Sequence, residues 1–109
     1  MNEYKVIANN LIKAMSYLNR EIKEFVNREK FTDEKTAECL ALVTETAETS
    51  EYENLKEVAK NYLNIRNAVI VERNQPENRK ALYYEWYLLR DLESMEMRLD
   101  IQTNATVIG

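Results

Sequence analysis

Pairs of glutamates spaced one helical turn apart are the first residues of this sequence whose type and spacing could support chemistry. They are Glu21 and Glu24, Glu48 and Glu51, and Glu93 and Glu96. Helical bundles can hold divalent metal ions between such carboxylates, and a metal-dependent nucleotide pyrophosphohydrolase would be the enzyme of that design. Its site needs acids that converge from at least two helices, whereas the first pair falls on an outer helix face. We therefore expect solvated acids and no metal site.

Missing residue types exclude most other catalytic chemistry. The only glycine is Gly109, and the chain has no histidine. Phosphate-binding loops, dinucleotide-binding turns and nucleophile elbows need glycine, because the backbone there approaches a ligand closely or takes a strained turn. Without histidine there is no Ser-His or Cys-His pair. The lone Cys39 is expected to be a small buried core thiol, with a reactive thiol as the alternative. The sequence predicts a protein that is not an enzyme and uses no cofactor.

Arg66 and Glu85 are charged residues on otherwise apolar helix faces. On a helical wheel each is flanked by apolar residues one turn away, and the register derived below puts the two level across a hairpin. We predict that they form a structural ion pair that fixes this register. Such a pair need not add net stability, since desolvating both charges costs several kcal/mol. A polar group that awaits a ligand is the alternative.

Four aromatic residues crowd into the five positions from Tyr83 to Tyr87, more than one core can absorb. Three of them are expected to point outward together with two arginines and a methionine; the full set is Arg79, Tyr83, Trp86, Tyr87, Arg90 and Met97. These residue types are enriched at interface hot spots, and Arg90 lies within cation–π reach of Trp86. We predict that they form the centre of a protein interface. The alternatives are burial against the first two helices, or a nucleotide-stacking site in which Arg79, Lys80 and Arg90 meet phosphates.

Apolar residues recur at helical spacing in four segments. In the first, Tyr4, Leu11, Leu18 and Phe25 follow one another at intervals of seven, with smaller apolar residues between them. Cap residues mark the later starts: Thr32 before the second helix, the Ser50 capping box before the third, and Pro76 in the first turn of the fourth. The predicted helices span residues 2–29, 33–49, 51–73 and 76–101, followed by a frayed tail over residues 102–109.

The apolar stripes also agree in register. In an antiparallel hairpin, facing residues have position numbers with a nearly constant sum. This holds for Phe25 with Ala37 and Leu18 with Thr44, and again for Val69 with Ala81 and Tyr62 with Leu88. The sequence therefore predicts an all-α domain over residues 1–101, an antiparallel bundle of two αα-hairpins whose second helix is short. A short second helix leaves the ends of its neighbours uncovered, which favours an oligomer.

These observations favour a non-enzymatic interaction protein that self-associates as a homodimer and binds another protein through the aromatic face. The net charge of −4 argues against binding to a nucleic-acid backbone. No signal peptide or apolar run long enough to span a membrane is present, so we expect a cytoplasmic protein. Its composition suits a small phage or mobile-element protein that inhibits or adapts a host protein. A nucleotide-binding protein that uses the same aromatics with Arg79 and Arg90 is the alternative.

Overall fold

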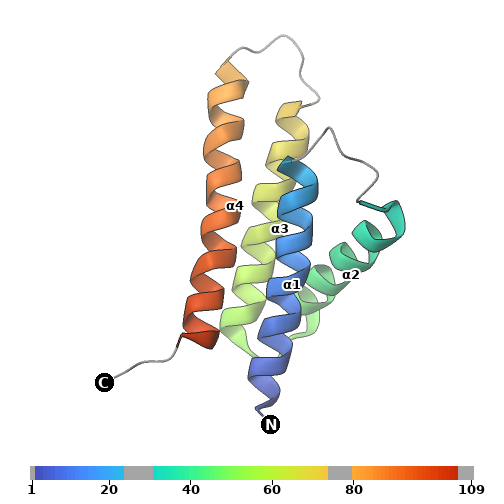
Figure 1. The fold of residues 1–109 in the computed structure, drawn as a ribbon, viewed down its shortest axis with the longest axis vertical. Coiled ribbons are helices and arrows are strands. Elements are labelled where there is room, and N and C mark those ends of the chain that lie inside the picture. Colours follow the sequence, from blue (N-terminus) through green and yellow to red (C-terminus); the bar gives the residue numbers. More distant parts are fainter. Residues whose placement is uncertain (1, 24–30, 74–79, 106–109) are drawn as a thin grey trace.

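Four helices pack side by side in the part of the chain that the structure describes (Figure 1). The computed structural model describes residues 2–23, 31–73 and 80–105, with side chains of the last range described from residue 85. Its helices are α1 (Glu3–Lys23), α2 (Asp33–Thr49), α3 (Glu53–Arg73) and α4 (Lys80–Asn104). Both α1 and α3 pack against α2 and α4. The predicted all-α bundle of two hairpins with a short second helix is confirmed.

Helix boundaries agree with the sequence at some points and differ at others. Thr32 caps α2 as predicted, because its hydroxyl accepts a hydrogen bond from the backbone N–H of Lys35 at 3.1 Å. The capping box at Ser50 does not form. The backbone N–H of Ser50 donates instead to the Thr46 carbonyl of α2, and α3 begins only at Glu53. Helix α4 continues three residues beyond the predicted end. The predicted helical residues 24–29 and 76–79, and the tail 106–109, lie outside the described residues.

The core is built from one apolar stripe on each helix. It confirms most of the predicted stripes of α1, α3 and α4, although Tyr4, Val58 and Ile65 are only half-buried. Phe25 and the side chain of Ala81 lie outside the described part. The buried apolar residues with side chains larger than alanine are Leu11, Met15, Leu18, Ile22, Val43, Leu55, Tyr62, Val69, Leu88, Leu92, Met95 and Leu99. Burial of each of the larger aliphatic side chains contributes about 1.5–3 kcal/mol, so these stripes set how the helices face each other.

Helix α2 is rotated relative to the prediction. Val43 and Ala47 are buried as expected, but Ala37 and Thr44 of the predicted face are exposed, and Thr46 is buried instead. In Figure 1, α2 runs obliquely to the other three helices, with its C-terminal end towards the start of α3. Only its later turns therefore meet the core. Because alanine and threonine side chains are small and similar in hydrophobicity, the sequence does not distinguish clearly which face of this helix is buried.

A chain of hydrogen bonds crosses the middle of the core. The Tyr62 hydroxyl of α3 lies 2.6 Å from Asn19 Oδ1 of α1 and 3.2 Å from the Met15 carbonyl oxygen, and it donates to the nearer acceptor. Asn19 Nδ2 in turn donates to the Leu92 carbonyl at 3.2 Å and to Glu96 Oε1 at 2.9 Å, both on α4. Three helices are thus joined through one buried amide. Burial also raises the pKa of the Tyr62 hydroxyl above its usual range, which keeps it a donor.

Removing the Tyr62 hydroxyl should destabilise the bundle. Tyr62→Phe leaves Asn19 Oδ1 buried without a donor, and the expected cost is about 1–3 kcal/mol in the free energy of unfolding. Tyr87→Phe, at a ring that is 59% exposed, makes the same chemical change outside the core and should alter stability by less than about 0.5 kcal/mol. Urea unfolding measures both. Equal stabilities of the two variants would contradict the role of this hydrogen bond.

Candidate functional site

The outward face of α4 carries an exposed apolar stripe. The stripe consists of Trp86, Tyr87, Arg90, Met97 and Ile101. The side chains of Trp86, Tyr87, Met97 and Ile101 are 51%, 59%, 62% and 55% exposed, and Arg90 is also exposed. At 100° per residue the five positions fall within an arc of about 100°, which keeps them on one side of the helix. Glu93 and Ser94 lie between Arg90 and Met97 along this side. We call this set the α4 stripe, and it extends about 22 Å at a rise of about 1.5 Å per residue.

The α4 stripe lies opposite the core face of the same helix. Leu88, Leu92, Met95 and Leu99 point into the bundle, and at 100° per residue they fall on the other side of the helix from Trp86, Arg90 and Met97. Burial of one face therefore forces exposure of the other. The sequence left open the alternative that these residues are buried against the first two helices. This alternative is wrong for Trp86, Tyr87, Arg90 and Met97, because all four are exposed.

Two ring contacts order the aromatic end of the stripe. The rings of Trp86 and Tyr87 meet edge to face, with centroids 5.2 Å apart and an interplanar angle of 72°. The Arg90 guanidinium carbon lies 4.9 Å from the centroid of the Trp86 ring, which confirms that these two residues are within cation–π reach. Such contacts contribute about 0.5–1 kcal/mol at exposed sites. They favour one orientation of the indole ring, while about half of Trp86 stays open to solvent.

The remaining predicted residues of this surface are only partly described. Tyr83 belongs to α4, three residues before Trp86, but its side chain lies outside the described part, and so does the side chain of Lys80. Arg79 lies outside the described residues altogether. Ile101 was missed by the sequence analysis, which placed the helix end there. Its position four residues after Met97 was the signal that could have added it.

The predicted ion pair between Arg66 and Glu85 is wrong, because each residue has another partner. Arg66 Nη2 lies 3.4 Å from Glu21 Oε1 of α1. Glu85 pairs instead with Nε of Arg73, two turns further along α3. Arg66 follows Tyr62 by one turn, on the face of α3 that reaches α1 across the bundle. The prediction considered only contacts between the two helices of one hairpin, so it missed this contact between α1 and α3, which lie diagonally across the bundle.

Glu21 is half-buried, although the sequence placed it on the outer face of its helix. Its carboxylate meets Arg66 and also accepts a hydrogen bond from the Thr36 hydroxyl of α2. Burial raises the pKa of this carboxyl group above 4.5, and the nearby Arg66 charge opposes the rise. Burial also costs Arg66 free energy of desolvation, because its Nε is buried without a hydrogen-bond partner in the described part of the chain. This cluster joins α1, α2 and α3.

The glutamate pairs and Cys39, the other candidates from the sequence, do not form a recognisable site in the described ranges. No three Asp, Glu or Cys side chains there gather closely enough to hold a metal ion. Glu93 and Glu96 are engaged with α1, the first with Lys23 at 2.6 Å and the second with Asn19. Cys39 is half-buried rather than buried as expected, and burial raises the pKa of its thiol. None of the described helices is both long and apolar enough to cross a membrane.

Comparison with protein families, curated proteins and solved structures returns no match.

A double-mutant cycle should distinguish the observed ion pair from the predicted one. Glu21→Leu leaves the buried Arg66 guanidinium without its anion, and Arg66→Leu leaves the half-buried Glu21 carboxylate without its cation. Each should destabilise by about 1–3 kcal/mol. The double variant should recover much of that loss, a coupling of about 1–3 kcal/mol. The matched cycle with Arg66→Leu and Glu85→Leu should be additive. Urea unfolding measures both cycles, and coupling confined to Glu85 would restore the prediction from the sequence.

The raised pKa of Glu21 gives a pH dependence with a definite sign. A carboxyl group with a raised pKa binds its proton more tightly in the folded state, so the stability that it contributes is lost as the pH rises through that pKa. Glu21→Gln keeps the neutral form at every pH. The stability difference should therefore shift in favour of Glu21→Gln as the pH rises above 4.5. A shift in favour of the parent protein would show that the Arg66 charge outweighs burial.

Proposed function

We propose that this protein is a non-enzymatic helical interaction protein and that the α4 stripe is its partner-binding surface. The observation that supports this most strongly is the position of the stripe, which lies opposite the core and is left exposed by the four described helices. Contiguous exposed apolar surfaces usually mark contacts with other molecules. Tryptophan, tyrosine and arginine are also the residues that most often dominate binding energy at interfaces.

A second copy of the chain is the occupant that the stripe fits best. In an antiparallel pairing of two α4 helices centred next to Ser94, Trp86 of one copy faces Ile101 of the other, and Arg90 faces Met97. Each contact then occurs twice, as a two-fold axis requires. The aromatic end of one stripe covers the aliphatic end of the other. Arg90 of each copy approaches an apolar residue rather than the other arginine, so like charges are kept apart.

The pairing also accounts for the arrangement of charges beside the stripe. Glu93 lies at the edge of the outward face, close to the centre of the proposed pairing, and is held by Lys23 of its own chain. With this carboxylate neutralised, two copies can approach without repulsion between the glutamates. The small Ser94 at the centre leaves room for close contact between the helices.

Shortening the large side chains of the stripe should abolish self-association without unfolding the protein. We expect the parent protein to have the mass of two chains, each of 12.9 kDa, in light scattering. Trp86→Ala combined with Met97→Ala should give a monomer with unchanged helicity by circular dichroism. The matched control combines Val6→Ala with Val71→Ala at two exposed apolar residues outside α4, 42% and 54% exposed, and should remain a dimer.

Three outcomes would contradict the proposed dimer. The parent protein could be monomeric at all concentrations, which would leave the stripe for a different protein, such as the host protein expected from the composition. The stripe variant could remain dimeric, which would place the contact elsewhere. An unfolded stripe variant would instead mean that Trp86 or Met97 supports the core.

A further inference from the structure

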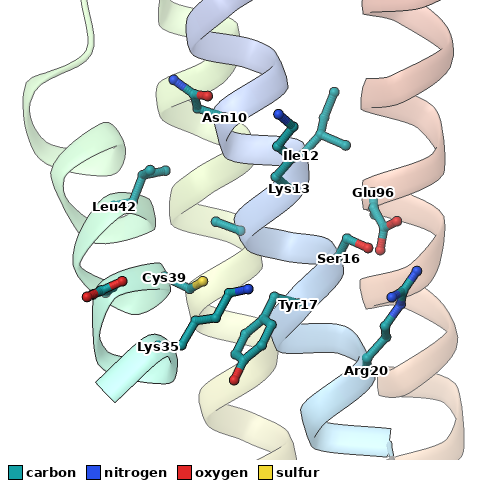
Figure 2. Close-up of a pocket in the computed structure, with 12 residues that line it drawn as sticks. Asn10, Ile12, Lys13, Ser16, Tyr17, Arg20, Lys35, Cys39, Leu42 and Glu96 are labelled. Carbon is teal, nitrogen blue, oxygen red and sulfur yellow. The ribbon is translucent and has the colours of Figure 1, made fainter. Parts of the chain in front are cut away.

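A groove runs over α1 between α2 and α4 (Figure 2). It has a volume of about 620 Å³, within the range of about 300–1,000 Å³ that is common for small-molecule sites. Apolar side chains of α1 and α2 form much of its lining, among them Ile12, Tyr17, Cys39 and Leu42. The oblique course of α2 explains why this groove exists, because its early turns are not packed against the core.

Tyr17 forms a fixed wall of the groove. Its hydroxyl accepts a hydrogen bond from the backbone N–H of Thr32 at 3.0 Å, at the start of α2. Its ring also meets that of Phe31 edge to face, with centroids 5.3 Å apart. The ring is therefore held between α1 and the N-terminal end of α2. A wall anchored in this way does not have to be ordered when a ligand binds, which lowers the entropic cost of binding.

Three cationic side chains line the same groove. They are Lys13, Arg20 and Lys35, and within the described ranges none of them forms an ion pair. Lys35 Nζ lies 4.8 Å from the centroid of the Tyr17 ring, which holds the charge beside the apolar wall. Two carboxylates also line the groove, the exposed Glu38 and the half-buried Glu96. The three cations outnumber the two carboxylates, so the lining carries a net charge of +1 and favours an anion.

We propose that this groove binds a small organic anion with an apolar body. The ligand's apolar part would lie on Tyr17 and Leu42, and its carboxylate, sulfonate or phosphate group would meet Lys35 beside the Tyr17 ring. Lys13 and Arg20, which Figure 2 shows further along the groove, would add attraction at longer range. The groove is open to solvent on one side, and its volume is that of a small-molecule site. This site does not involve the α4 stripe, so the proposal is independent of self-association.

A fluorescent pair of probes tests the proposal directly. Anilinonaphthalene sulfonate combines an aromatic body with an anionic group, and phenylnaphthylamine is the same body without the sulfonate. The sulfonate should bind one molecule per chain at this groove. Lys13→Gln, Arg20→Gln and Lys35→Gln together should weaken its binding by about tenfold through loss of the charge attraction. The same variant should change the affinity for phenylnaphthylamine little.

The matched control removes three cations elsewhere. Lys5→Gln, Lys56→Gln and Lys60→Gln together produce the same change in net charge away from the groove and should leave binding of the sulfonate unchanged. Titrations are run on the full chain in parallel, with circular dichroism to show that every variant is folded. Equal weakening in both triple variants would mean that the anion responds only to the overall charge, and the proposal would be wrong.

Cys39 supplies a second readout at the site. It is the only cysteine of the chain, so alkylation by iodoacetamide reports on this groove alone. Saturating anilinonaphthalene sulfonate should slow that reaction several-fold in the parent protein. A bound probe that leaves the alkylation rate unchanged occupies another surface, such as the α4 stripe, and would overturn the proposal even if the affinities behaved as expected.

Discussion

The hydrogen bond between Tyr62 and Asn19 is the constraint on which the arrangement of the bundle depends. An apolar stripe tolerates small rotations of a helix, because neighbouring aliphatic groups can replace one another. A buried amide does not, since a lost partner costs its full desolvation. Asn19 bonds to α3 and α4 together, so the rotation of both helices is fixed relative to α1. The side of α4 that remains in solvent, with Trp86 on it, follows from this.

The sequence was sufficient for the architecture because most of its stripes are large and regular. Exposing a leucine on such a stripe to water costs free energy, and Leu11, Leu18 and Leu92 are all buried. The rotation of α2 could not be obtained in this way. Its apolar residues are mostly small, so burial of Thr46 in place of Thr44 changes the free energy little until the neighbouring helices are specified. Tertiary contacts decide the orientation of such a helix.

The candidate sites show a similar division. Exposure of Trp86 and Arg90 was predictable, because crowded aromatics on one helix cannot all enter one core. The partner of Arg66 was not, since the sequence gives the register between hairpin neighbours but not the contact across the diagonal. There, α1 and α3 run in the same direction, and Glu21 meets Arg66. The groove lined by Lys35 was equally hidden, because it results from the tilt of α2.

The placement of the Asn19 partners has a consequence for synthesis of the chain on the ribosome. The Asn19 amide donates to the Leu92 carbonyl and the Glu96 carboxylate. Both acceptors lie more than 70 residues after Asn19 in the chain. While α1, α2 and α3 emerge, the Asn19 amide has only water as a partner for its donors. A three-helix nascent chain therefore keeps one hydrated seam beside α1. Closure of that seam must wait for α4, so the packing around Asn19 is completed only after α4 has been synthesised.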